Sequence, residues 1–157
     1  MKLNEIPAFR QALENVADYS GEKFAYAVYK NMRLADQTMK NVKKPEEYPK
    51  NFKEFEDARV AVCENFAAKD ENGKPIIEEG NYKIPDADQK KFEDEINALK
   101  EKHKDVIEAK KKIDVDYIEY LGTEADVIFH TVEEKYLPKE ITARQIDGIS
   151  SMIVFES

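Results

Sequence analysis

Apolar side chains recur at steps of three and four along the first 113 positions, which is the spacing of one face of an α-helix. The most regular stripe consists of Phe92, Ile96, Leu99, His103, Val106, Lys110 and Ile113. It predicts a helix over residues 87–113, with Asp86 as its N-terminal cap. Shorter stripes predict helices over residues 7–18, 20–44 and 50–69. We therefore expect three long helices that pack antiparallel at shallow crossing angles.

The helical pattern is interrupted between residues 70 and 85. Residues 70–73 contain a turn signal, and two short apolar runs at 75–77 and 82–84 flank a second turn signal at residues 79–81. This arrangement predicts a β-hairpin over residues 72–84. Because its strands are short and mostly polar, we expect the hairpin to pack against the helices.

Beyond residue 113, two segments favour strands. Apolar and acidic side chains alternate over residues 113–117, which is the period of a strand with one buried face. Residues 127–132 are rich in β-branched and aromatic side chains and predict a second strand. Thr123 and Asp126 leave open the alternative that a short helix begins there.

The last element is predicted to be a short helix, because Thr142 and Gln145 have the spacing of a capping box and an apolar face follows them. The elements together predict a mainly α fold of the α+β class. We expect an antiparallel long-helix bundle with a β-hairpin excursion, a small C-terminal β element and a closing helix. One domain should cover residues 1–157, with a helical body at 1–112 and a C-terminal α/β cap at 113–157.

Composition is compatible with one folded domain and narrows the classes of function. The 157 residues include eight Phe and eight Tyr but only five Gly, so apolar anchors are plentiful and turn positions are too few for an all-β fold. The single cysteine excludes a disulfide framework. No apolar stretch approaches the length of a membrane span, and the first residues do not resemble an export signal. We expect a cytoplasmic protein without a membrane partner.

Acidic residues outnumber basic ones by 33 to 25, which gives a formal charge of −8. This balance argues against direct nucleic-acid binding, because phosphate contacts require clustered Lys and Arg. The charge is uneven along the chain, at +3 over residues 1–45, −6 over 46–88, +2 over 89–112 and −7 over 113–157. Either the segments pack beside one another with complementary charge, or the acidic segments share a face that docks on a basic partner.

No pattern of residues predicts a catalytic site, a metal site or a cofactor. Acidic pairs at helical spacing occur at Glu54/Asp57, Asp105/Glu108 and Asp116/Glu119. They lie far apart and are expected by chance among so many carboxylates. His103 and His130 do not have the spacing of a zinc site, and no glycine-rich phosphate loop is present. Cys63 lies among apolar residues, where a buried and inert thiol is the common outcome.

Tyrosines beside charged residues are the remaining candidates for a functional surface. Tyr26 and Tyr29 lie off the main apolar stripe of their predicted helix. A second group combines tyrosines and acids near residues 114–120 and consists of Asp114, Asp116, Tyr117, Glu119 and Tyr120. Exposed tyrosines among charges are typical of protein interfaces. The alternative is that these rings lie at the edge of the core with only their hydroxyl groups in water.

Part of the chain resembles a known group of proteins. The residues that carry the resemblance are Lys69-Asp70-Glu71-Asn72-Gly73, Gly80-Asn81-Tyr82-Lys83-Ile84, Phe92, Glu95, Leu99, Leu137-Pro138, Ile141-Thr142 and Met152-Ile153. Over about residues 50–153 the chain is similar to uncharacterised small accessory or late proteins of tailed bacteriophages. The resemblance implies a viral protein that acts through binding, in the host cytoplasm or associated with the virion.

Three hypotheses about function follow. The first is a non-enzymatic protein–protein interaction protein, a phage virion-assembly or accessory factor that self-associates. The second is an acidic phage inhibitor of a host defence nuclease that acts as a nucleic-acid mimic. The third is a magnesium-dependent helical nucleotide hydrolase, which would require the acidic pairs to converge in one pocket.

Overall fold

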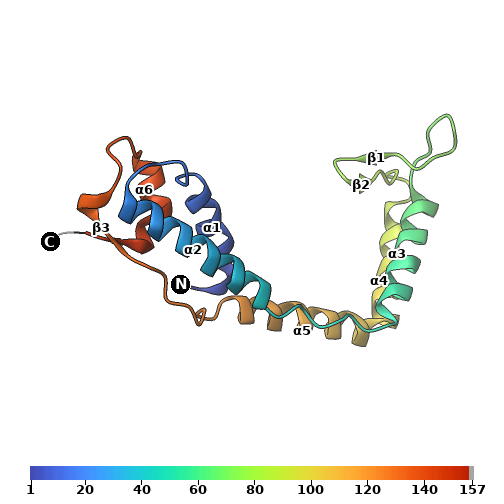
Figure 1. Ribbon diagram of the computed structural model, residues 1–157. Helices are drawn as coiled ribbons and strands as arrows, with labels where there is room; N and C mark the ends of the chain where they lie inside the picture. The colour runs from blue at the N-terminus through green and yellow to red at the C-terminus, as the bar shows by residue number, and fades with distance from the viewer. Residues whose placement is uncertain (156–157) are drawn as a thin grey trace. The chain divides into compact units, whose positions relative to one another are not determined.

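The computed structural model describes residues 1–155 and is mainly helical, with two small pairs of strands (Figure 1). This confirms the predicted α+β class. The chain forms two compact units. Unit 1 consists of residues 1–44 and 117–155, and unit 2 consists of residues 45–116. The boundary falls inside one continuous helix, α5 (Lys104–Leu121).

Unit 1 is built from both ends of the chain. Its elements are a 3-10 turn at Leu3–Glu5, α1 (Ile6–Glu14), α2 (Glu22–Asn41), the end of α5, β3 (Val132–Glu133), a 3-10 turn at Glu134–Tyr136, α6 (Ala143–Ile149), a 3-10 turn at Ser150–Met152 and β4 (Ile153–Val154). β3 and β4 pair in parallel, with Val132 opposite Ile153. Thr142 caps α6 and Gln145 completes the capping box, as predicted.

A closed apolar core holds unit 1 together. Its buried members are Phe9, Leu13, Val16, Phe24, Ala27, Val28, Val132, Ile149, Met152 and Ile153. α1 packs on α2 and on α6, and Gly148 permits the second contact. A Cβ at Gly148 would lie 2.9 Å from the Cβ of Ala12, so only glycine allows this approach without a shift of one helix.

One polar side chain, Asn31 of α2, lies fully buried in this core. Its amide nitrogen donates to the carbonyl oxygen of His130 at 2.9 Å, and its amide oxygen accepts from the backbone N–H of His130 at 2.7 Å. The side chain thus forms the two hydrogen bonds that a neighbouring strand would form, and it fixes the segment that precedes β3. Asn31 occupies a step of the apolar stripe between Val28 and Ala35, which is the signal in the sequence that could have indicated it.

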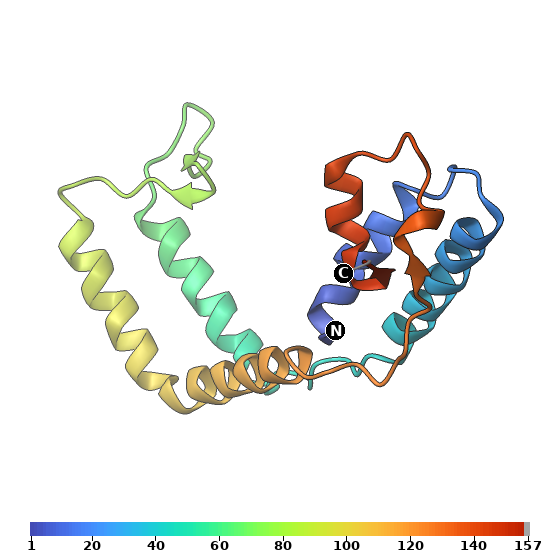
Figure 2. The same cartoon turned by 90° about the vertical axis from the view of Figure 1, so that its left-hand side faces the viewer.

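Unit 2 consists of two helices joined by a hairpin, followed by the first part of α5 (Figure 2). Its elements are α3 (Phe52–Phe66), β1 (Ile77–Glu78), β2 (Asn81–Tyr82), α4 (Gln89–Lys102) and α5 up to residue 116. The predicted hairpin is confirmed, and its turn places Glu79 and Gly80 at φ angles of 50° and 82°. Two successive positive φ angles define the tight turn that matches the twist of short hairpins.

Unit 2 buries few side chains. Phe55, Cys63 and Ala67 are its buried apolar residues, and α4 and α5 contain no buried residue. The thiol of Cys63 is buried, as predicted. α3 packs on α4 through rings such as Phe66 and Phe92, whose centroids are 6.0 Å apart. Most apolar side chains of unit 2 therefore remain partly exposed.

Three expectations about local structure are wrong. Residues 113–117 are helical and belong to α5, so Ile113 and Tyr117 lie half-buried on one side of the helix while Val115 is exposed. Residues 127–131 are irregular, and only Val132 and Glu133 form a strand there. The helix expected over residues 87–113 is two helices that meet at His103, whose φ and ψ are −111° and 22°. The ring of His103 packs 5.6 Å from that of Phe55, a tertiary contact that periodicity does not report.

The three long helices are divided between the units. α2 packs on α1 in unit 1, whereas α3 and α4 pack together in unit 2. Residues 117–155 pack with the first 44 residues of the chain. One domain over residues 1–157 stays a prediction, because units defined by their contacts need not unfold independently.

Candidate interaction surfaces

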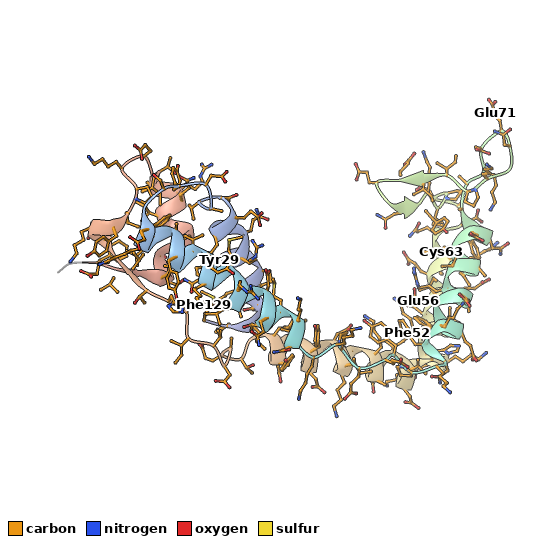
Figure 3. All side chains as sticks on the ribbon, in the orientation of Figure 1. Tyr29, Phe52, Glu56, Cys63, Glu71 and Phe129 are labelled. Atoms are coloured by element: carbon orange, nitrogen blue, oxygen red, sulfur yellow. The ribbon has the colours of Figure 1, made fainter. Side chains whose placement is uncertain are left out.

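Tyr26 and Tyr29 of α2 are each 54% exposed. Tyr29 is labelled in Figure 3. The ring of Tyr26 meets that of His130 edge-on at 5.9 Å. Arg33 donates to the hydroxyl oxygen of Tyr29 at 3.1 Å, and this bond lowers the pKa of Tyr29. Both rings are therefore accessible, and their role as contact residues stays a prediction.

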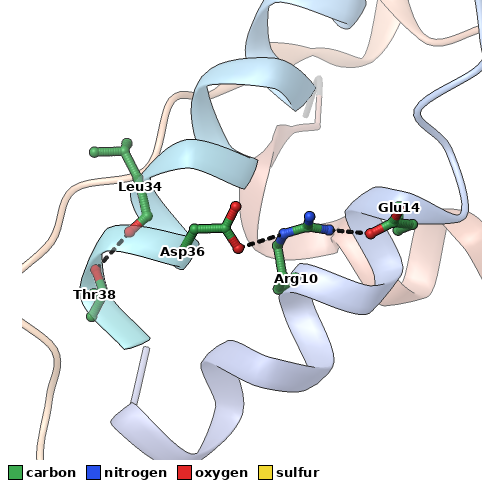
Figure 4. A network of polar contacts seen from close by, with 5 residues as sticks. All are labelled: Arg10, Glu14, Leu34, Asp36 and Thr38. Carbon is green, nitrogen blue, oxygen red and sulfur yellow. Dashed lines mark hydrogen bonds and ion pairs between the residues drawn. The ribbon is translucent and has the colours of Figure 1, made fainter. Parts of the chain in front are cut away.

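The acid on the same helix is already engaged. Asp36 accepts a hydrogen bond from Nε of Arg10 at 2.9 Å, while the other end of that guanidinium contacts Glu14 (Figure 4). Thr38 donates to the carbonyl oxygen of Leu34 in the same helix at 2.8 Å. Arg10 thus joins α1 to α2 at the edge of the core.

Tyr117, Glu119 and Tyr120 lie at the end of α5 that belongs to unit 1. The hydroxyl oxygen of Tyr120 accepts a hydrogen bond from the backbone N–H of Lys43 at 3.1 Å. The rings of Tyr117 and Tyr120 are 6.1 Å apart. Tyr120 therefore ties the chain beyond α2 to α5, and both tyrosines are only partly exposed.

Asp114 and Asp116 lie in unit 2 and differ in environment. Asp114 contacts Lys110 Nζ and accepts a hydrogen bond from the hydroxyl of Tyr48 at 2.8 Å. The bond from Lys110, with that from Tyr48, lowers the pKa of Asp114. The same carboxylate raises the pKa of the Tyr48 hydroxyl. Asp114 thus holds the loop before α3 against α5, whereas Asp116 is exposed.

An open groove of about 730 Å³ runs along unit 2 between α3, α4 and α5. We call it the α3–α5 groove. Its lining consists of Phe52, Phe55, Glu56, Arg59, Asn97, Lys100, Glu101, Lys104, Ile107, Glu108, Lys110 and Lys111. Phe52 and Glu56 can be followed along α3 in Figure 3. The apolar part comes from Phe52, Phe55 and Ile107, and charged side chains surround it.

The groove carries an excess of positive charge. Arg59 binds Glu56 through two hydrogen bonds of 3.2 and 3.0 Å, which raise the pKa of Arg59, and Lys110 is held by Asp114. Lys100, Lys104 and Lys111 form no ion pair with any described residue. Two acids of the lining, Glu101 and Glu108, partly offset these three lysines.

Sequence reasoning did not find this groove. It depends on the change of helix direction at His103, which brings Ile107 to the same side as Phe52 and Phe55. Ile107 lies off the stripe that was expected to continue from Leu99 through Val106. The available signal was the run of aromatic residues on α3, whose spacing indicates a broad apolar face.

Neither a cluster of metal-binding side chains nor a membrane-spanning helix is formed by residues 1–155. Within this part of the chain, no three His, Cys, Asp or Glu side chains are grouped so that they could hold a metal ion. None of the described helices combines the length and the apolar character needed to cross a membrane. The hydrolase alternative and the absence of a cofactor stay predictions.

Comparison with known protein families, with curated proteins and with solved structures finds no match. The similarity to phage proteins therefore stays a prediction that rests on the residues that carry it.

Proposed function

We propose that the chain is a non-enzymatic protein-binding protein that self-associates through the α3–α5 groove. The observation that carries the proposal is the contrast inside unit 2, where apolar side chains are many and buried ones are few. An open groove with an apolar floor and a charged rim is the form of surface that proteins use to hold an anchor side chain of a partner.

The positive charge of the groove favours a second copy of the chain as its partner. The groove presents three lysines without carboxylate partners, whereas residues 113–134 contain seven acidic residues and no Lys or Arg. Attraction between such surfaces gives orientation and speeds encounter. Assembly into a virion, as the phage resemblance implies, would be one use of this property.

The test is the mass of the protein in solution, measured by sedimentation over a wide range of concentrations. We expect the average mass of the wild type to rise with concentration, and Ile107→Asp to remain monomeric because a carboxylate replaces an apolar wall. Ile77→Asp is the matched control, since Ile77 is exposed on the hairpin outside the groove.

A second variant provides a test even if Ile107→Asp does not fold. Lys104→Glu with Lys111→Glu changes two exposed side chains of the rim and should leave the far-UV circular dichroism spectrum intact. This variant should also stay monomeric. A wild type that is monomeric at every concentration would refute the proposal.

A further inference from the structure

The side chain most exposed among the large apolar residues of the described chain is Ile128 of unit 1, at 92%. It lies in the irregular segment between α5 and β3, two residues after Asp126. The next residues are Phe129, which is half-buried, and His130, which is exposed. A fully exposed isoleucine in a folded segment has no role in the core of its own unit. The contacts of the neighbouring residues explain why this side chain is exposed.

The segment that carries Ile128 is held in place at both ends. Before it, the backbone N–H of Ala125 donates to the carbonyl oxygen of Met1 at 3.0 Å. After it, the amide of Asn31 binds both backbone groups of His130. Between these points the ring of Phe129 turns inward and packs on Phe9 at a centroid distance of 4.8 Å.

Ile128 is directed outward by this arrangement. Because successive side chains of an extended segment point to opposite sides, burial of Phe129 leaves Ile128 and His130 on the outside. A side chain that is displayed on a fixed backbone loses little conformational entropy when it binds, and this favours association. The segment thus has the properties of a preformed anchor.

Acidic residues flank the anchor along the chain, with no Lys or Arg between residues 113 and 134. Glu124 pairs with the N-terminal ammonium group of Met1 and Glu133 pairs with Lys135. Asp126, two residues before Ile128, forms no ion pair with any described residue. The α3–α5 groove has the complementary properties, an apolar floor and an excess of lysine at its rim. Anchor and groove belong to different units.

We propose that Ile128 of one copy of the chain docks in the α3–α5 groove of a second copy, with Asp126 facing the rim lysines. This inference rests on the proposed function and specifies the partner segment. Since the two surfaces differ, the contact is head-to-tail, and such contacts give closed rings or growing chains.

Mixing two variants tests this arrangement. Ile128→Asp keeps the groove and loses the anchor, whereas Lys104→Glu with Lys111→Glu keeps the anchor and blocks the groove. At a concentration where the wild type is just associated, each alone should be mainly monomeric, and an equimolar mixture should form a one-to-one dimer that grows no further. We expect Ile128→Asp to weaken self-association by about tenfold or more, given the apolar area removed from the contact.

Charge reversal on both surfaces adds a rescue. Asp126→Lys should weaken self-association, and combining it with Lys104→Glu and Lys111→Glu in one chain should restore part of it. Ile77→Asp again serves as the control for an exposed isoleucine outside either surface.

The results separate the two proposals. If the wild type self-associates and Ile107→Asp abolishes this while Ile128→Asp does not, the groove binds something else and the anchor is wrong. If the Ile128→Asp variant and the blocked-groove variant do not combine when mixed, the head-to-tail contact is overturned. A monomeric wild type would overturn both proposals.

Discussion

Unit 1 and unit 2 contain similar kinds of residue and use them differently. Unit 1 buries twelve apolar side chains, ten of them in one cluster around α1, α2 and α6, whereas unit 2 buries three and leaves the rest at least partly exposed. Burial of apolar area is the main source of stability. The comparison teaches that the stability of this chain is concentrated in unit 1, while unit 2 retains apolar surface for contacts with a partner.

The polar contacts of the two units follow the same division. In unit 1, Asn31 is fully buried and binds both backbone groups of His130. In unit 2, the contact among Lys110, Asp114 and Tyr48 lies at the surface. Water competes for the second contact and not for the first, so the loss of Asn31 should be much more costly.

The largest expected effect comes from truncating an aromatic side chain in each unit. Phe24→Ala removes a ring that is fully buried in unit 1, and we expect a loss of about 3–5 kcal/mol in the free energy of unfolding. Phe66→Ala removes a partly exposed ring of unit 2 and should cost less than about 2 kcal/mol. Urea unfolding followed by far-UV circular dichroism measures both.

The same curves test whether residues 1–157 unfold as one domain. In that case each variant should shift a single transition. Equal costs for the two variants would contradict the difference between the units.

The second effect concerns the buried amide of unit 1. Asn31→Ala should lower the free energy of unfolding by about 2–3 kcal/mol, because it leaves the backbone N–H and carbonyl of His130 without partners. Hydrogen exchange of the His130 amide should become faster than in the wild type. Asn41, at the exposed end of α2, provides the control, since Asn41→Ala removes a similar side chain without a buried partner. Wild-type protection of His130 in Asn31→Ala would show that the amide does not hold this segment.

The smallest effect concerns the surface contact of unit 2. Lys110 holds the pKa of Asp114 below its usual range, so the contact stabilises the fold above the unfolded pKa of about 3.9 and is lost as pH falls through the lowered value. Lys110→Gln should raise the pKa of Asp114 toward that ordinary value, with little change in stability at neutral pH. Titration of the carboxyl carbon by NMR measures the shift. An unchanged pKa in Lys110→Gln would leave Tyr48 as its cause.

Local patterns were enough for the elements whose signals are local. The turn at Glu79 and Gly80 and the capping box of Thr142 and Gln145 depend on residues within a few positions of one another. The apolar stripes likewise located α2 and α3 to within a few residues. Strand and helix could not be separated at residues 113–117, because the continuation of α5 depends on contacts that five residues do not reveal.

The candidate site was predicted less well for the same reason. Tyr26 and Tyr29 are exposed, as the pattern suggested, yet the partners of Asp114 and Tyr120 are Tyr48 and Lys43, which are distant in sequence. The groove required the break at His103, and the position of Ile128 required Asn31. Each of these depends on a contact between residues far apart along the chain.

The sequence by itself determined that this protein is mainly helical, has a hairpin near residue 80 and carries an acidic excess in two segments, since these properties follow from periodicity, turn chemistry and composition. Only the tertiary structure decided that residues 117–155 pack with the first 44 residues, that one helix becomes two at His103 and that Ile128 is displayed outward. Long-range packing selects among alternatives that are nearly equal in local free energy, so these outcomes are fixed when distant side chains meet.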